Sequence, residues 1–182
     1  MSYPQPHHVW TVTEYLAWEP QQEVRHEFDG FEPVAMVGGT AAHHRIIRNG
    51  ETALRTRLRR CEVFRETMKL RLESTYRYPD LMVVCSPIPG SVTEVADPVV
   101  VIEVLSEGNA REDRIIKNEE YHRTPSIQHY VMLEQDSIAA TVFVRSGDDW
   151  IGRVVTGPEA VLAFPEIEVE VPLAEFYVGV LD

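Results

Sequence analysis

The chain has 182 residues, of which 44% are hydrophobic and 25% are charged, so it can bury a core of its own and is not a disordered protein. Its formal net charge of −12 excludes a protein that coats nucleic acid through bulk attraction, although a local basic surface is compatible with it. No apolar run approaches the roughly 18 residues needed to cross a membrane, and residues 1–10 lack the features of a signal peptide. The two cysteines, Cys61 and Cys85, are too few for a disulfide scaffold, so we expect buried thiols and a cytoplasmic protein.

The chain contains no internal repeat, Gly/Ser linker or low-complexity segment, which predicts one domain over residues 1–182 with an N-terminal tail at 1–10. Hydrophobic periodicity and turn residues predict its elements. In chain order these are a short helix at 12–18, a strand pair at 26–30 and 34–37, a long helix from 41 to 60, strands at 61–65, 68–72, 81–85 and 99–102, a helix at 109–122, strands at 127–133, 140–144 and 150–155, and a short helix at 173–177. This order predicts an α/β or α+β fold in which helices pack on a mixed central sheet.

The signals behind these elements differ in kind. Thr11 and Glu14 have the spacing of a capping box, and Thr40 is expected to cap the long helix. The apolar side of that helix is predicted to contain His43, Ile47, Leu54 and Leu58. Segments 81–85 and 99–102 are continuous apolar runs, which is typical of central strands covered on both faces.

Positive charge is concentrated in one segment. Residues 40–60 contain six arginines and one glutamate, a net charge of +5 within an acidic chain. Such a segment either follows the phosphates of a nucleic acid or is the solvated face of a helix, and the cluster alone favours the second interpretation. The first interpretation makes Arg45, Arg48 and Arg55 candidate nucleic-acid-binding residues.

Two carboxylates interrupt the apolar strands. Asp80 begins the run at 81–85, and Glu103 lies within the apolar stretch that begins at Val99. A carboxylate in such a strand is costly to desolvate unless a cation or several hydrogen-bond donors meet it. Glu103 is therefore either a strand-end residue paired with an arginine or a ligand of a bound cation. For Asp80 the alternative is a turn, because a Pro-Asp pair is common in ordinary turns. Together on neighbouring strands, the two carboxylates are the ligands that Mg²⁺ prefers.

Further candidates lie on the two main helices. Asp113 and Lys117 are four residues apart, so they share a helix face, and this spacing favours a surface ion pair. The alternative is catalytic, because a lysine beside a metal would orient water and stabilise charge on phosphate. His43 is expected first as a buried helix contact and second as a residue lining the site. His43 and His44 point about 100° apart on a helix and are not expected to chelate one ion together.

Several motifs carry a resemblance to a known family over nearly the whole chain. They are His26-Glu27-Phe28, the run from Met36 to His43 with its Gly-Gly pair, Met68-Lys69, Tyr78-Pro79-Asp80, the run from Ile102 to Ser106, and Asp113 with Lys117. In their order and spacing they resemble the large bacterial family of restriction-endonuclease-like proteins, a domain of unknown function within the PD-(D/E)xK nuclease superfamily. The resemblance implies a restriction-endonuclease-like core and carboxylates that bind Mg²⁺ or Mn²⁺ to hydrolyse the phosphodiester bonds of DNA.

Carried over residue by residue, the resemblance makes Asp80 and Glu103 the metal ligands and Glu27 an auxiliary catalytic carboxylate. The lysine departs from the superfamily pattern, because Leu105 occupies the E-x-K position. The resemblance then implies that the catalytic lysine has moved onto the following helix as Lys117, which its long side chain permits.

Two functions remain open at this stage. The first is a metal-dependent nuclease that acts on DNA, and the second is a catalytically inactive nuclease-fold module that binds nucleic acid or protein. The net charge, the missing E-x-K lysine and the extra charge of Glu107 favour the second. In either case we expect a homodimer, because the β-rich C-terminal part offers strand edges that need covering.

Overall fold

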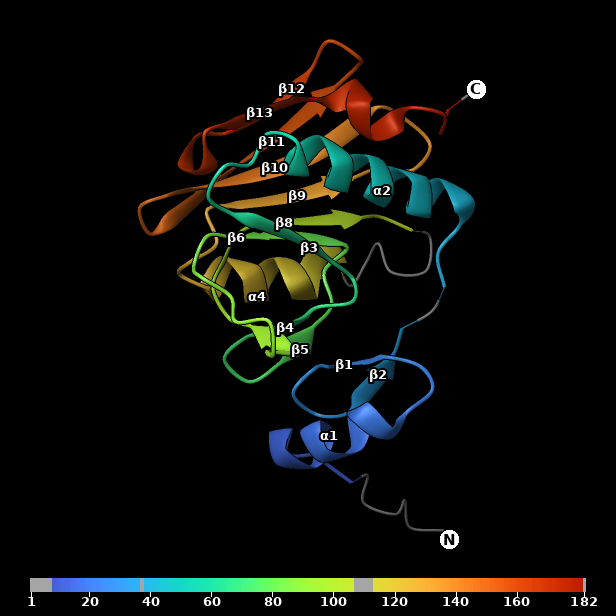
Figure 1. Cartoon of the computed structure of the whole chain (residues 1–182), viewed down its shortest axis with the longest axis vertical. Coiled ribbons are helices and arrows are strands. Elements are labelled where there is room, and N and C mark those ends of the chain that lie inside the picture. Colours follow the sequence, from blue (N-terminus) through green and yellow to red (C-terminus); the bar gives the residue numbers. More distant parts are fainter. Residues whose placement is uncertain (1–7, 37, 107–112, 182) are drawn as a thin grey trace, which may run out of the picture.

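The computed structural model describes residues 8–36, 38–106 and 113–181 (Figure 1). Most of the expected N-terminal tail and Glu107 lie outside this part of the chain. The helical elements are α1 (Val12–Trp18), η1 (Glu19–Gln21), α2 (Ala41–Arg55), η2 (Asp113–Lys117), α4 (Asn118–Arg123), η3 (Pro165–Ile167) and η4 (Leu173–Tyr177); η2 is π-helical and the other η elements are 3-10 helices. Within the described residues, no helix is both long enough and apolar enough to span a membrane.

The strands form two main sheets and a hairpin. They are β1 (His26–Phe28), β2 (Pro33–Ala35), β3 (Glu62–Arg65), β4 (Lys69–Arg71), β5 (Tyr76–Arg77), β6 (Leu81–Val84), β7 (Glu94–Val95), β8 (Pro98–Val104), β9 (His129–Leu133), β10 (Ala139–Ser146), β11 (Asp149–Thr156), β12 (Val161–Phe164) and β13 (Val169–Pro172). The larger sheet has six strands in the order β11-β10-β9-β8-β6-β3, and the smaller has five in the order β2-β1-β5-β4-β7. β8 and β9 are parallel while their neighbours pair antiparallel, so the larger sheet is mixed as expected.

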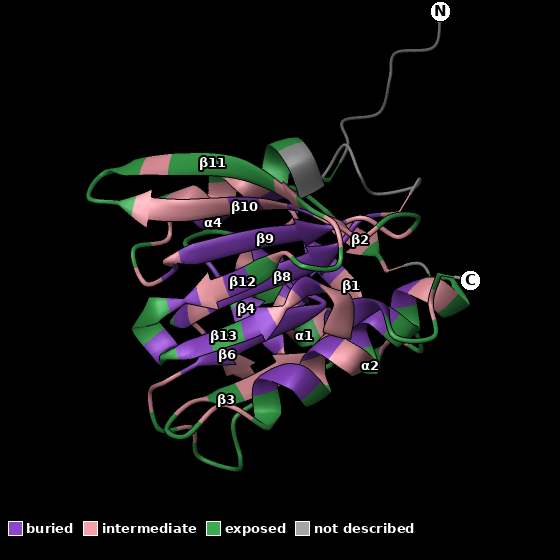
Figure 2. Cartoon of the chain, turned by 90° about the horizontal axis from the view of Figure 1, so that it is seen from above, coloured by how far each residue is buried: buried purple, intermediate pink, exposed green. Residues whose placement is uncertain are grey.

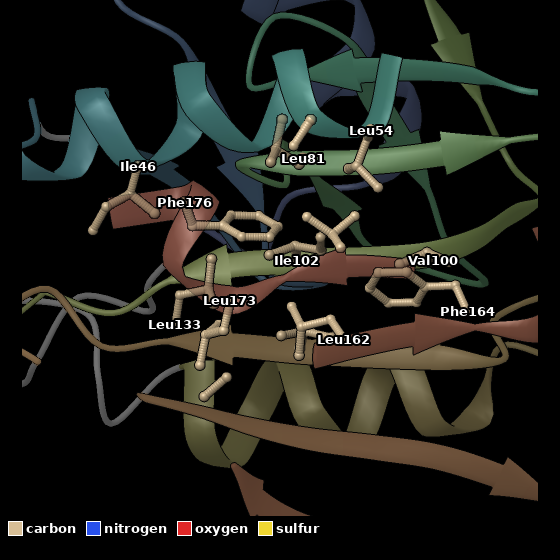
Figure 3. Packing of buried hydrophobic residues seen from close by; sticks show 14 of the residues in the cluster. Ile46, Leu54, Leu81, Val100, Ile102, Leu133, Leu162, Phe164, Leu173 and Phe176 are labelled. Atoms are coloured by element: carbon tan, nitrogen blue, oxygen red, sulfur yellow. The ribbon is translucent and has the colours of Figure 1, made fainter. Parts of the chain in front are cut away.

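The central strands β6, β8 and β9 of the larger sheet are covered on both faces, whereas the outer strand β11 is mostly exposed (Figures 1 and 2). On one face, α2, η4 and the β12–β13 hairpin pack against alternate residues of the central strands, including Leu81 and Ile102 (Figure 3). On the other face, Tyr121 of α4 and Leu70 of β4 pack against the intervening residues of the central strands, such as Met82 of β6 and Val101 of β8. This two-sided burial explains why β6 and β8 are apolar throughout, apart from Glu103.

The predicted helix at 41–60 is too long, because α2 ends at Arg55. Side chains from the next turn satisfy the last helical carbonyls: Thr56 donates its hydroxyl to the carbonyl of Ala53, and the guanidinium of Arg57 donates to the same oxygen. Arg57 also pairs with Glu175 at 2.7 Å. The basic segment is therefore a helix followed by a turn, and Arg57, Arg59 and Arg60 lie beyond the helix.

The expectation of free thiols is wrong, since Cys61 and Cys85 form a disulfide. β3 and β6 pair antiparallel with Glu62 opposite Val84. Cys61 precedes Glu62 and Cys85 follows Val84, so this register brings the two cysteines opposite each other. Their Cα atoms are 4.1 Å apart. Sequence spacing alone gave no indication of this, because the pairing depends on the strand register.

The short strands β5 and β7, each of two residues, and the β12–β13 hairpin were not expected from the sequence. Strands of two residues are too short to show the alternation on which strand prediction depends. One of these missed elements matters below, because β5 carries Arg77 and forms part of the smaller sheet beside the site.

Candidate active site

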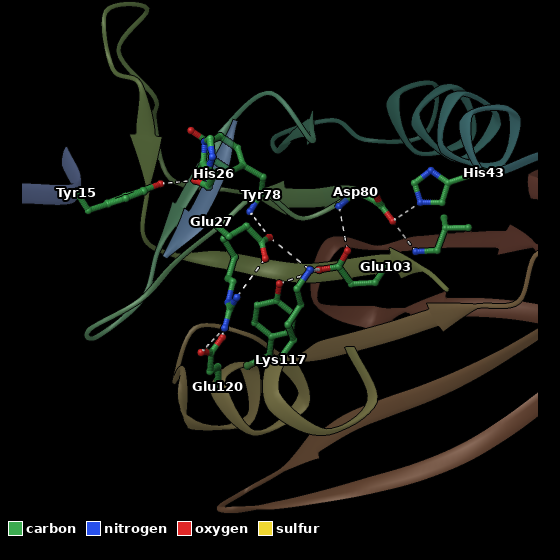
Figure 4. A network of polar contacts seen from close by, with 12 residues as sticks. Tyr15, His26, Glu27, His43, Tyr78, Asp80, Glu103, Lys117 and Glu120 are labelled. Carbon is green, nitrogen blue, oxygen red and sulfur yellow. Dashed lines mark hydrogen bonds and ion pairs between the residues drawn. The ribbon is translucent and has the colours of Figure 1, made fainter. Parts of the chain in front are cut away.

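A cavity of about 320 Å³ brings the candidate catalytic residues together. Its lining includes Glu27 from β1, His43 from α2, Asp80 just before β6, Glu103 from β8 and Lys117 from η2. These residues span ninety positions of the sequence and come from both sheets and two helical segments. The cavity lies where the smaller sheet meets the end of the larger one (Figure 4).

Asp80 and Glu103 are direct neighbours at this point. The antiparallel register of β6 and β8 pairs Leu81 with Ile102, so the residues on either side of this pair are adjacent. The Asp80 amide donates to Glu103 Oε2 at 3.3 Å, and the Val104 amide donates to Asp80 Oδ2 at 2.7 Å. Both carboxylates are buried, with Glu103 only 2% exposed. The sequence argument that placed them on neighbouring strands agrees with this geometry.

Lys117 supplies a positive charge to the buried carboxylates. Its Nζ lies 3.3 Å from Glu103 Oε1 and 3.4 Å from Glu27 Oε1. Tyr121, one turn further along, donates its hydroxyl to Glu103 Oε1 at 2.8 Å. Burial, followed by the negative charge of Glu103, raises the pKa of Tyr121 well above its usual value, so this phenol stays a neutral donor.

This arrangement corrects two of the simpler sequence interpretations. Glu103 pairs with Lys117, whereas the alternative interpretation expected an arginine beside it. Lys117 is buried, so it does not belong to a surface ion pair as the helix spacing favoured. The side chain of Asp113, the other member of that expected pair, lies outside the described part of the structure.

Glu27 is held by several donors. Arg77 Nη1 lies 3.1 Å from Glu27 Oε2, and the Tyr78 amide donates to Glu27 Oε1 at 3.0 Å. Burial raises the pKa of Glu27, but the charges of Lys117 and Arg77 and these hydrogen bonds outweigh it, so the pKa lies below its ordinary value. Glu27 is therefore an ionised carboxylate inside the protein.

His43 lines the site through Asp80. Its Nε2 is 3.1 Å from Asp80 Oδ2, and the start of α2, capped by the Thr40 hydroxyl, orients the imidazole towards β6. Burial lowers the pKa of His43, but the hydrogen bond and charge of Asp80 outweigh it and raise the pKa overall. His44 is exposed and its ring is nearly perpendicular to the ring of His43, so the two histidines do not chelate one ion together.

The three candidate nucleic-acid-binding arginines are all exposed on α2, and their spacing of three and seven residues places them on one side of this helix. Arg45 and Arg48 line a neighbouring cavity of about 220 Å³, which shares His44 and Ile47 with the site cavity. Arg55 is in the last turn of α2 and lines neither cavity. The surface next to the carboxylates thus takes its positive charge mainly from the first half of the helix.

Sequence reasoning missed three residues of this site: Arg77, Glu120 and Tyr121. Arg77 is fully buried, and its guanidinium pairs with Glu27 and, through Nε and Nη2, with both carboxylate oxygens of Glu120. A single arginine among tyrosines gives no sequence signal of burial. The spacing of Lys117, Glu120 and Tyr121 along one helix was the only local indication that these residues share a face.

The donor set fits a hard divalent cation. Asp80 and Glu103 offer carboxylate oxygens side by side, and Mg²⁺ or Mn²⁺ is commonly held by one or two carboxylates together with water and phosphate oxygens. Among the described residues, no group of three or more His, Cys, Asp or Glu side chains is arranged to hold a metal. A structural zinc site, which needs four protein ligands, therefore finds no match in this part of the chain.

Comparisons with known proteins agree with this architecture. A solved structure described as a putative nuclease belonging to DUF820, from Anabaena variabilis, superposes with a TM-score of 0.75 at 15% identity, covering 94% of this chain and 99% of that chain, which confirms a restriction-endonuclease-like fold. Two uncharacterized proteins of Synechocystis sp. are also similar. The protein slr1290 is 31% identical over 76% of this chain and 76% of its own length. The protein sll1609 is 29% identical over 86% of this chain and 93% of its own length. The model of the Uma2 family, described as "Putative restriction endonuclease", matches residues 12–174, and the chain therefore belongs to this family.

Proposed function

We propose that the protein is a nuclease that hydrolyses phosphodiester bonds of DNA with Mg²⁺ or Mn²⁺ held by Asp80 and Glu103. Family membership supports a nuclease in general. The observation that carries the finer proposal is the position of Lys117, whose ammonium lies 3.3 Å from Glu103 in the same cavity as Asp80. A lysine from the following helix thus stands beside the carboxylate pair, although the E-x-K position is occupied by Leu105.

Each side chain has a physical role in this proposal. The bound cation would polarise the scissile phosphate and lower the pKa of water. Lys117 would orient the attacking water and stabilise negative charge that develops on the phosphate. Glu27 would keep Lys117 charged and in place, while Tyr121 and His43 would fix the orientations of Glu103 and Asp80. Arg45 and Arg48 would bind the DNA backbone next to the cavity.

The test begins with metal, because this requires no knowledge of the substrate. Calorimetric titration of Mn²⁺ and Mg²⁺ should detect binding to the wild type, and binding should disappear in Asp80→Asn and in Glu103→Gln. Glu62→Gln, an exposed change on β3, is the matched control and should bind as the wild type does. Circular dichroism establishes that each variant is folded.

Cleavage of supercoiled DNA in the presence of Mn²⁺ is the second measurement. We expect the wild type to nick it and Lys117→Met to do so about 10²–10³-fold more slowly, because a charge aimed at the transition state is lost. If Arg45 and Arg48 bind phosphates, replacing each by alanine should reduce the slope of log affinity against log salt by about 0.9. A wild type that binds no metal and cuts no DNA or RNA would contradict the proposal and favour a catalytically inactive binding module.

A further inference from the structure

Four charged side chains at the site are joined by three ion pairs, and the helical segment that carries the first and the last of them completes a ring, here called the charge ring (Figure 4). Lys117 contacts Glu27 at 3.4 Å, Glu27 contacts Arg77 at 3.1 Å, and Arg77 contacts Glu120 at 2.7 Å. Lys117 and Glu120 are three residues apart at the junction of η2 and α4, so the helical segment closes the ring. The ring joins this segment to β1 and β5 of the smaller sheet.

The charge ring acts on a helical segment that is also held by Tyr121, which is buried in the core and donates to Glu103. η2 is π-helical, a conformation that is rare and has weaker internal regularity than an α-helix. The N-terminus of α4 has no side-chain cap, since its N-cap residue is Lys117 itself. A lysine side chain also has about 2 kcal/mol of rotamer entropy, so its ammonium takes one position only if its partners are held rigidly.

Glu27, which contacts Lys117, is itself held by Arg77 and by the Tyr78 amide. Oε2 of Glu27 faces the guanidinium of Arg77, and Oε1 faces the Tyr78 amide and Lys117. Both oxygens are thus engaged with donors of the protein. Arg77 is in turn fixed by the bidentate contact with Glu120, the geometry in which arginine orients a carboxylate most strongly.

We propose that Arg77 and Glu120 are positioning residues, which hold Glu27 and the Lys117 segment together so that the ammonium stays beside Glu103. The catalytic meaning of this inference rests on the proposed function, but the positioning itself is measurable without any activity. Neither residue lines the site cavity, so both act through Glu27 and Lys117 and not on the substrate.

The lysine content of the chain makes a sharp test available. Two lysines stand against fifteen arginines in the sequence, and both lysines are buried. Lys69 pairs with Glu19 at 3.0 Å and lies against the ring of Tyr15 at 5.3 Å, apart from the charge ring. It is therefore an internal reference in the same molecule for the accessibility of Lys117.

The experiment measures reductive methylation of the folded full chain with formaldehyde and a borane, following each lysine by peptide mass spectrometry. In Glu120→Gln we expect Lys117 to be modified about tenfold faster than in the wild type, the effect of losing one hydrogen bond to a charged group. Lys69 should keep its wild-type rate. Arg77→Lys keeps the charge but loses the planar fork that contacts both oxygens of Glu120, so it should change the rates in the same direction.

Glu119→Gln is the matched control, because Glu119 is the neighbouring residue on α4 but pairs with exposed Arg123 at the surface. It should leave both rates unchanged. If Lys117 stays protected in Glu120→Gln and Arg77→Lys, or if Lys69 becomes reactive in parallel, the positioning role is wrong and the ring is a general contribution to stability. If Lys117 responds as expected but the metal titration is negative, the positioning role stands and the proposed nuclease function fails.

Discussion

Glu27 illustrates how burial and charge compete at a single residue. Desolvation alone would raise its pKa, but Lys117, Arg77 and the Tyr78 amide lower it by more and keep the carboxylate ionised. Because its pKa in the folded protein is below the ordinary value of 4.5, the folded state favours the charged form. Glu27 therefore contributes stability that is present above about pH 4.5 and is lost as the pH falls through the lowered pKa.

Replacement of this residue gives a pH-dependent prediction. Glu27→Gln should lower the free energy of unfolding by about 1.5–3 kcal/mol at pH 7, because Arg77 and Lys117 each lose one of their two carboxylate partners and keep only Glu120 and Glu103. The difference from the wild type should shrink below pH 4.5, where the wild-type carboxyl also becomes neutral. Urea unfolding at several pH values measures it, and exposed Glu32→Gln is the control. A difference that stays constant between pH 7 and pH 3 would contradict this account.

At the scale of elements, α2 has two functions that depend on its different ends. Its first turn directs His43 at Asp80, and its middle packs on the core through Ile46, Ile47 and Leu54 (Figure 3). Gly50 lies at the closest approach of this helix to its neighbours. A Cβ atom at this position would be 2.5 Å from Phe176 Cε1 and 2.8 Å from Leu81 Cδ1.

Gly50→Ala should therefore destabilise the protein, although alanine is the better helix former. The gain in helix propensity is about 1 kcal/mol, and overpacking costs about 1–3 kcal/mol. We expect a net loss that shows as a lower urea midpoint with an unchanged slope. Thr52→Ala, an exposed change in the same helix, should be neutral or slightly stabilising. An increase in stability for Gly50→Ala would mean that η4 can move away from α2.

At the scale of the whole molecule, the disulfide joins the edge strand β3 to β6, the strand that follows Asp80. It closes a loop with a sequence separation of 24 residues. For a loop of this length, the chain-entropy model predicts about 3 kcal/mol of stabilisation. The larger sheet thus keeps its edge strand by a covalent bond as well as by pairing.

Reduction should consequently lower the stability of the folded protein. We expect dithiothreitol to lower the free energy of unfolding of the wild type by about 3 kcal/mol. The double variant Cys61→Ser with Cys85→Ser should have the stability of the reduced protein and should not respond to dithiothreitol. Equal urea midpoints for the oxidised and reduced wild type would show that the disulfide contributes nothing.

Much of the fold was predictable from sequence because its signals are local. The capping box of Thr11 and Glu14, the Thr40 cap and the apolar runs of β6 and β8 each depend on neighbouring residues, and the structure confirms all of them. The two-residue strands and the disulfide depend on partners distant in the chain, and Arg57 after the end of α2 is held partly by distant Glu175. Their prediction failed or was absent for that reason.

The same division applies to the site. Asp80 and Glu103 stood out in the sequence because a carboxylate in a buried strand needs compensation, and this need is visible without a structure. The source of that compensation was decided by tertiary structure alone. Register places Asp80 beside Glu103, and packing of α4 brings Lys117 and Tyr121 onto Glu103 and encloses Arg77 between Glu27 and Glu120. Charge pairing acts through space, so residues ninety positions apart become neighbours only when the two sheets and the helical segment pack together.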